Sequence, residues 1–294
     1  MAVFTTGTLQ LPNKMAQGLI TKVRDESVIA RLAPASAAST LLNDQYNLVT
    51  TEPEMEFVAE GGQKSQGDYA TTPKITGRYK AVGTLRFSDE VLLASEEEQI
   101  GILEDATAAM AAAGSRALDY GIFHAVSPKT GGAITGATSL VSGATAVTST
   151  TDPVADMDGL PDSIISNGYN VTGVGLAPTY ANTLRKVRNA DGVKMFPEIP
   201  LNVRDAADID GVKAAISSTV NGSRITPATG IKAIMGDYSL IKWGIVREIR
   251  TKLIEYGDPD NTGNDLQGHN EVALRYEIIY KWVVIDPLGF AVLS

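Results

Sequence analysis

The chain has 294 residues, of which 44% are hydrophobic and 20% charged, and this composition predicts a globular protein with one large or two ordinary domains. Its 34 acidic and 25 basic side chains give a net charge of −9, which argues against nonspecific nucleic-acid binding, because such binding needs clustered Lys and Arg. The absence of cysteine excludes disulfides and cysteine-ligated metals. We find no signal peptide or membrane span, so we expect a cytosolic protein.

Residues 1–48 predict a loosely patterned arm. Residues 15–23 hold one short amphipathic segment, and a weakly patterned, extended connection follows it. An arm of this kind either lies on a neighbouring subunit or is a frayed terminus.

Residues 49–87 predict a β-hairpin with a very long tip. Two strand-like runs flank the polar, glycine-rich segment AEGGQKSQGDYATTPK, residues 59–74. Ordinary hairpin tips hold two to five residues. We therefore expect this tip to reach for something outside its own domain.

Two helices are predicted after the hairpin. A short one begins near Ser88, its expected N-cap. A long one begins at a capping box of Ser95 and Glu98 and ends at Phe123, a length of about 42 Å. Its predicted packing face is small and suits a flat partner such as a sheet. That face consists of Ile100, Leu103, Thr107, Met110, Gly114 and Ala117.

The second half of the chain has an α/β pattern from about residue 153 to 236 and long strands after it. The predicted helices are 156–170 and 179–196, and the predicted strands are 171–178, 231–240, 243–258 and 271–293, the last bending at Pro287.

No motif predicts an active site, a cofactor or a metal. The segment GGAITGAT, residues 131–138, has the glycine spacing of a phosphate-binding loop but carries Ala137 where the lysine belongs. Residues 258–269 begin like a calcium loop but end in His269 instead of the bidentate Glu, so we expect a solvated turn. Neither His124 nor His269 belongs to an HxxxH or HExxH motif, so we expect no metal site at either. No GxSxG nucleophile elbow occurs, so nothing specific indicates acyl transfer.

The order of the segments resembles the major capsid protein of tailed bacteriophages, whose Hong Kong phage capsid fold is shared with encapsulins. ESVIARLAP is similar to the end of that family's N-terminal arm, and the hairpin is similar to its extended loop. The long helix, with Asp119 near its end, is similar to the spine helix. Further similar segments are GLAPTYANTLRKVRNADGVKMF in the axial domain, and MGDYSLIKWGIVREIRTKLIEYGD and NEVALRYEIIYKWVVIDPLGFAVL in the closing strands.

The resemblance implies an α+β fold with an N-terminal arm, an extended β-hairpin loop, a peripheral domain with a long spine helix and an axial α/β domain. The implied boundaries are 1–48 for the arm, 49–87 for the loop, 88–126 with 246–286 for the peripheral domain, and 127–245 with 287–294 for the axial domain.

The resemblance also implies a function. The chain would self-assemble as pentamers and hexamers into an icosahedral shell around the phage genome, in the host cytoplasm, and reside in the virion. Partners would be further copies, a scaffolding protein, a portal and an optional decoration protein; an acidic lining would repel the enclosed double-stranded DNA. One alternative is an encapsulin shell, which the extended first residues oppose. A second is a soluble α+β hydrolase, for which we find no catalytic groups.

Some family members join a loop Lys to an Asn of another subunit with the help of a Glu. Lys64, Asn270 and Glu277 stand at the matching places, so the resemblance implies an isopeptide crosslink with Glu277 as proton relay. Residues seven apart on a strand face opposite sides, so Asn270 and Glu277 would need a twist or irregularity to face the same way. The alternative is that these charged residues form ordinary ion pairs.

Overall fold

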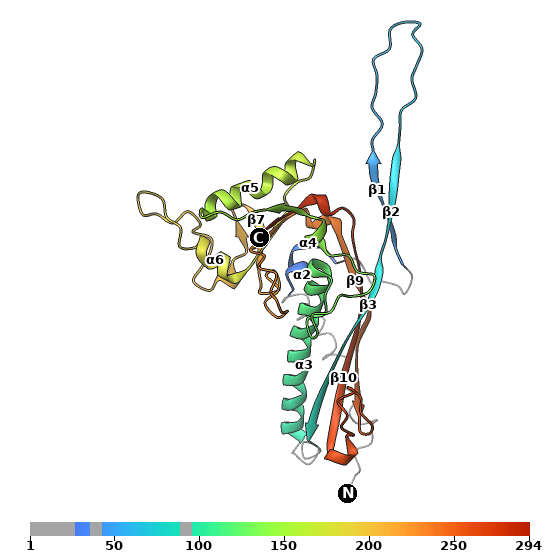
Figure 1. The fold of residues 1–294 in the computed structure, drawn as a ribbon, viewed down its shortest axis with the longest axis vertical. Helices are drawn as coiled ribbons and strands as arrows, with labels where there is room; N and C mark the ends of the chain where they lie inside the picture. The colour runs from blue at the N-terminus through green and yellow to red at the C-terminus, as the bar shows by residue number, and fades with distance from the viewer. Residues whose placement is uncertain (1–26, 36–42, 89–95) are drawn as a thin grey trace.

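The structure of the chain, a computed structural model, describes residues 27–35, 43–88 and 96–294. It is elongated, with a long loop at one end, a three-stranded sheet and a long helix at the other, and a mixed α/β part to one side (Figure 1). The predicted arm segment 15–23 and the short helix after Ser88 fall mostly outside the described residues.

The long hairpin is a two-stranded ribbon that continues into a second sheet. β1 (Gln45–Thr51) pairs antiparallel with β2 (Ala70–Ile75), and residues 52–69 form the tip beyond the last pair, Thr51 and Ala70. β3 (Gly77–Ser88) follows after the buried Thr76. The long tip is as predicted, but the second strand-like run divides, because β3 leaves the ribbon and pairs with β10 instead.

The three-stranded sheet has the order β3-β10-β9 and is entirely antiparallel. β9 covers Ile241–Ile254 and β10 covers Glu271–Val284. α3 (Glu96–Asp119) lies along this sheet and continues as a π-helical turn, Tyr120–His124, so the helical segment reaches about as far as predicted. The hydroxyl of Tyr280 donates to the carbonyl oxygen of Gly114 at 3.0 Å, a close approach that the small helix face permits.

The packing face of α3 is wider than predicted. Thr107 and Gly114 are buried as expected, whereas Met110 and Ala117 are half-buried. Further residues outside the predicted stripe are also buried: Ala106, Ala111, Ser115, Leu118 and Asp119. The helix is enclosed on this broader arc because α2 and residues 219–224 contact its C-terminal part as well.

The second sheet has six strands in the order β4-β11-β8-β5-β7-β6. These are β4 (Thr145–Val147), β5 (Gly173–Leu176), β6 (Asp208–Ile209), β7 (Val212–Ile216), β8 (Ala233–Gly236) and β11 (Phe290–Leu293). α5 (Pro153–Ser166) and α6 (Pro178–Leu184) bury an aliphatic core against it. Short helical turns connect the rest: α4 (Leu140–Gly143), Val203–Asp205, Tyr238–Leu240, Gln267–His269 and Pro287–Gly289.

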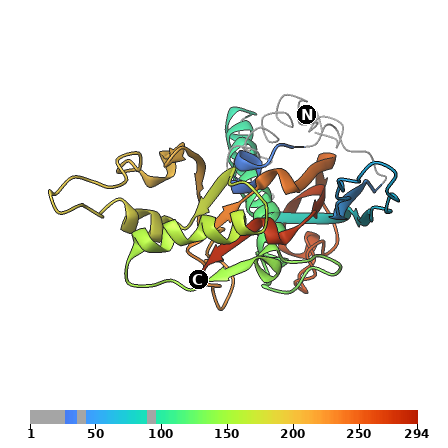
Figure 2. The same ribbon diagram turned by 90° about the horizontal axis from the view of Figure 1, so that it is seen from above.

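A second core joins the two sheets. α2 (Val28–Leu32) packs there with the end of α3 and with large aromatic side chains. Trp243 and Trp282 come from the long strands and Phe290 from β11. Seen along the long axis in Figure 2, α3 stands between the part built on the six-stranded sheet and the three-stranded sheet. Side chains from both sheets therefore pack together in this one core.

α6 is much shorter than the predicted helix 179–196. After Leu184 the chain turns, and Arg188 pairs with Lys194 in an isolated bridge. The side chain of Asn189 accepts the backbone N–H groups of Asp191 and Val193, which competes with helical hydrogen bonding. The strands β6 and β7 were not predicted at all.

Candidate functional site

The extended loop, residues 52–69, presents apolar side chains to solvent. Met55 is 97% exposed and Phe57 is 107% exposed, and neither side chain belongs to a hydrophobic core of the subunit. The loop is braced only locally, by the backbone N–H of Ser65, which donates to the Glu56 carboxylate at 2.6 Å and lowers its pKa. Large apolar side chains exposed together typically mark a contact surface.

The base of the loop is held firmly. The buried ammonium of Lys281, on β10, lies 2.7 Å from the carboxylate of Asp44 just before β1. The backbone N–H of Thr76 donates to the carbonyl oxygen of Asp44 at 2.9 Å. Tyr79 stacks on Trp282 with ring centroids 3.9 Å apart. These contacts fix the direction in which the ribbon projects from the body.

The residues of the implied crosslink lie far apart in one chain. Lys64 is exposed near the tip of the loop, and Asn270 is exposed at the start of β10, at the opposite end of the molecule (Figure 1). Glu277 lies within β10, paired with Val82 in register. Asn270 and Glu277 are separated by about 23 Å at 3.3 Å per residue. A single copy therefore does not bring the three together.

Two of these residues have defined local settings. Asn270 adopts the left-handed conformation, with φ of 51°, a geometry that Asn tolerates well. The Glu277 carboxylate lies 3.0 Å from the ammonium of Lys80, in a partly exposed ion pair. The register of β10 with β9 shifts next to Glu277, so the strand has an irregularity there.

Asp119, near the end of α3, is a fully buried carboxylate that holds α2 in place. It accepts hydrogen bonds from the hydroxyls of Ser27 and Thr219, the latter at 2.7 Å, and from the backbone N–H groups of Val28 and Ile29 at 3.1 and 3.2 Å. Burial raises the pKa of Asp119 to about 6, although these four donors favour the charged form.

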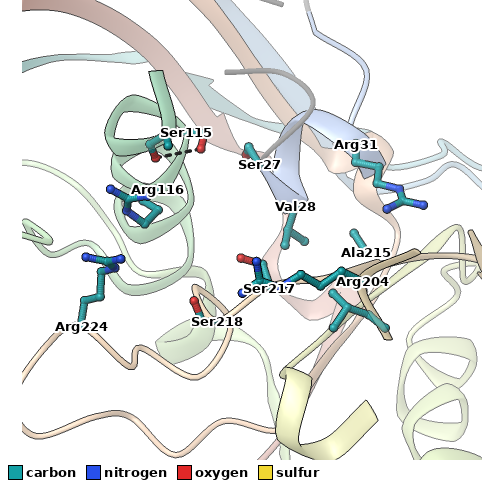
Figure 3. Close-up of a pocket in the computed structure, with 12 residues that line it drawn as sticks. Ser27, Val28, Arg31, Ser115, Arg116, Arg204, Ala215, Ser217, Ser218 and Arg224 are labelled. Carbon is teal, nitrogen blue, oxygen red and sulfur yellow. Dashed lines mark hydrogen bonds between the residues drawn. The ribbon is translucent and has the colours of Figure 1, made fainter. Parts of the chain in front are cut away.

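Four arginines line a pocket of about 440 Å³ between α2, α3 and the chain segment 204–224 (Figure 3). Arg116 and Arg224 point toward one another on one side, and Arg31 on the other donates to the carbonyl oxygen of Ala206 at 2.9 Å. The fourth is Arg204. Guanidinium groups bind carboxylates and phosphates, so the pocket is suited to an acidic group. No sequence spacing signals it, because only the fold brings these arginines together.

The calcium-like turn, residues 258–269, and Glu271 at the start of β10 enclose an arginine. Arg86 donates to Asp258 at 2.7 Å, to Glu271 at 2.9 Å and to both carboxylate oxygens of Asp260. The same guanidinium also donates to the Thr262 hydroxyl and the Asn264 carbonyl oxygen. These bonds and charges hold the pKa of Asp260 below its usual value. The turn was expected to be simply solvated; instead a side chain supplies its cation.

The remaining candidate motifs are structural. Residues 131–138 form a loop in which the Gly136 carbonyl oxygen accepts a hydrogen bond from Tyr79 at 2.8 Å. His124 is buried, which lowers its pKa, and its Nε2 lies 2.9 Å from the Thr219 carbonyl oxygen. His269 Nδ1 lies 2.9 Å from the Asp265 carbonyl oxygen. In the described ranges, no cluster of His, Asp or Glu is arranged for a metal and no helix could cross a bilayer.

Solved structures share this fold over most of the chain. A chain from Mycobacterium phage Ogopogo has 33% identity and a TM-score of 0.81, covering 91% of both chains. One from Gordonia phage Cozz has 27% identity and a TM-score of 0.74, covering 91% of this chain and 86% of its own. The capsid of an empty GTA particle shares the fold at 13% identity and a TM-score of 0.62, covering 91% of this chain and 89% of its own.

The family comparison agrees with the structural one. No curated protein matches the chain. The model of the phage capsid family matches residues 7–294. This match confirms the resemblance drawn from the sequence and decides for a capsid protein over the hydrolase alternative. The chain thus belongs to the phage capsid family: it is a structural protein that associates with itself in the shell of a virion.

Proposed function

We propose that the chain assembles as pentamers and hexamers into a closed icosahedral shell around double-stranded DNA. The observation that carries this proposal is the extended loop, which projects from a firmly held base and exposes Met55 and Phe57. Burying these two apolar side chains against another molecule would lower the free energy, because it removes apolar surface from water. Many weak contacts of this kind, repeated by symmetry, close a shell.

Further partners follow from the same role. A net charge of −9 disfavours tight binding to the DNA backbone, so we expect DNA to be enclosed without specific contacts. Assembly in the host cytoplasm would use a scaffolding protein and a portal, with an optional decoration protein outside. We also propose that the chain is divided into an arm (1–48), a loop (49–87), a peripheral domain (88–126 with 246–286) and an axial domain (127–245 with 287–294).

The experiment for the shell is negative-stain microscopy of the purified protein, with a scaffolding protein co-expressed. We expect closed particles or rings of five and six copies. A protein that stays monomeric by light scattering at every concentration and salt tested would contradict the proposal.

We also propose that Lys64 forms an isopeptide bond with Asn270 of another copy. The neutral amine attacks the side-chain amide carbon, a C–N bond forms, and ammonia leaves with the proton that Lys64 gives up. Glu277 of a neighbouring copy would relay that proton. Two observations support this proposal: Lys64 is exposed at the tip of the loop, and Asn270 is exposed at the start of β10. At least two copies must meet for this chemistry.

A denaturing gel of mature particles tests the crosslink. We expect a ladder of linked chains, with a Lys64–Asn270 peptide lighter by one ammonia in mass spectrometry. Lys64→Arg keeps the charge but cannot form the bond, and Glu277→Gln should slow it; both variants should still form shells. A single monomer band from mature wild-type particles would show that the loop is held by noncovalent contacts alone.

A further inference from the structure

The arginine-lined pocket is a concentrated positive site in an acidic protein. Among the described residues, those that line it include Arg31, Arg116, Arg204 and Arg224 but no Asp or Glu. The whole chain, in contrast, has a net charge of −9. Charges of one sign in a concave site focus the electric field and attract ions of the opposite sign. The pocket therefore attracts anions, although the chain as a whole is acidic.

The four arginines form two pairs that come from different parts of the chain. On one side of the pocket, Arg116 of α3 and Arg224 point toward one another (Figure 3). The backbone N–H of Arg224 donates to the hydroxyl of Tyr120, one turn after Arg116, at 3.0 Å. On the other side, Arg31 of α2 donates to a carbonyl oxygen two residues after Arg204, at 2.9 Å. A ligand that contacts both pairs would therefore bridge α2, α3 and the segment that carries the other two arginines.

The number of hydrogen-bond donors in the pocket favours phosphate over carboxylate. A guanidinium has five N–H groups in a planar fork, and the two oxygens of a carboxylate are satisfied by one or two such forks. A phosphate group presents three or more strong acceptor oxygens that point in different directions, so it can accept from guanidiniums on several sides. The pocket volume of about 440 Å³ is in the range of sites for organic ligands, which leaves room for more than one phosphate group.

We infer that the pocket binds an anion with two or more linked phosphate groups, held by one pair of arginines at each end. A free polyphosphate, such as a nucleoside triphosphate, and the backbone of a nucleic-acid strand both have this chemistry. All four arginines belong to one copy of the chain, so binding does not require the proposed shell. The bound anion would stabilise the subunit, because it contacts three elements at once and offsets the repulsion among the arginines.

Calorimetric titration of the purified full-length chain with sodium tripolyphosphate, at fixed ionic strength, tests the binding. We expect saturable binding with one site per chain. Citrate, which carries three carboxylates, should bind at least about tenfold more weakly, because one carboxylate satisfies fewer of the donors. Tripolyphosphate at about 100 times its dissociation constant should raise the melting temperature by about 4 °C.

A double variant removes one arginine from each pair. Arg204→Gln and Arg224→Gln replace exposed side chains, so the fold should be retained. We expect the affinity for tripolyphosphate to fall by about tenfold or more for each arginine removed, because each loses a charge-assisted hydrogen bond. The matched control, Lys186→Gln with Arg188→Gln, removes the same charge from exposed positions in the turn after α6 and should bind like the wild type.

Binding that is lost in the pocket variant and kept in the control supports the inference. A short DNA duplex then distinguishes the two sources of phosphate: if it competes with tripolyphosphate, the ligand is a strand backbone, and if it does not, the ligand is a free polyphosphate. Should the pocket variant not fold, Arg204→Lys with Arg224→Lys takes its place, since lysine keeps the charge but loses the fork. A reduced affinity of that variant supports the inference, and wild-type affinity overturns it.

Three other results would overturn the inference. These are no binding by the wild type, citrate binding as tight as that of tripolyphosphate, and an equal loss of affinity in the pocket variant and the control. Asp25 and Glu26 directly precede Ser27 in the sequence, and Ser27 lines the pocket. Should tripolyphosphate bind only after Asp25→Asn and Glu26→Gln, the pocket would be filled by acids of its own chain, which also overturns the inference.

Discussion

At the scale of single residues, Asp119 links the pH to the stability of the fold. Its pKa is raised to about 6, chiefly by burial, so the folded chain holds this proton more tightly than the unfolded chain does. Its stabilising contribution is therefore fully present below about pH 4 and is lost as the pH rises through about 6.

We expect Asp119→Asn to remove this pH dependence. Between pH 4 and 7, the free energy of unfolding of the wild type should fall relative to the variant by up to about 3 kcal/mol, because a shift of one pKa unit corresponds to about 1.4 kcal/mol. Urea unfolding of the unassembled subunit at several pH values measures this. Asp158→Asn, an exposed site on α5, is the control. A constant difference between wild type and Asp119→Asn would mean that the carboxylate stays ionised throughout.

Arg86 acts as the built-in cation of the turn 258–269 and the adjacent Glu271. Its removal would leave carboxylate, hydroxyl and carbonyl oxygens facing one another, the ligands that Ca²⁺ prefers. We expect Arg86→Ala to lower the melting temperature and added Ca²⁺ to restore part of it, with no effect of Ca²⁺ on the wild type. Arg86→Ala combined with Asp260→Asn should lose the response. Equal responses in wild type and Arg86→Ala would contradict this view.

At the scale of elements, the turn that ends α3 needs a glycine. A Cβ added at Gly121 would lie 2.7 Å from the ring of Trp282, which is itself buried and stacked on Tyr79. We expect Gly121→Ala to lower the free energy of unfolding by about 1–3 kcal/mol. A Cβ added at Gly159 in α5 would meet no atom of another element within 4 Å, so Gly159→Ala should instead be neutral or stabilise by up to about 1 kcal/mol. Chemical denaturation of both variants checks the pair; similar effects would refute the packing argument.

Elements with strong local signals were predictable, and those set by distant contacts were not. The periodicity of α3 and the alternation of β9 and β10 mark these elements in the sequence. β7 was missed because its sequence, VKAAI, lacks the aromatic residues typical of a strand. This segment forms a strand because it pairs with β5. α6 was overextended because Asn189 can form a turn that periodicity does not reveal.

The same distinction holds for the candidate sites. The loop could be found because its length is visible in the sequence. The Asp119 contacts join residues 90 to 100 positions apart, and the arginines of the pocket come from positions between 31 and 224, so no local pattern encodes either site. Arg86 could not be assigned to the calcium-like turn either, since the pairing of β3 with β10 brings it there.

At the scale of the whole molecule, the shape separates folding from assembly. The two cores are built from the sheets and helices, whereas residues 52–69 lie outside both. The loop therefore adds little to the stability of the subunit. Its contribution should be to contacts between copies.

Replacing residues 52–69 with Asn-Gly tests this division. Thr51 and Ala70 are already paired, so a two-residue turn can close the ribbon between them. We expect the free energy of unfolding of the subunit to change by no more than about 1 kcal/mol, because loop closure depends only weakly on length. Shells, in contrast, should be lost or dissociate at much lower urea, as seen by light scattering and negative-stain microscopy. A Gly/Ser loop of the original length should behave like the short turn if the side chains make the contact; if it assembles like the wild type, the length of the loop matters and its side chains do not.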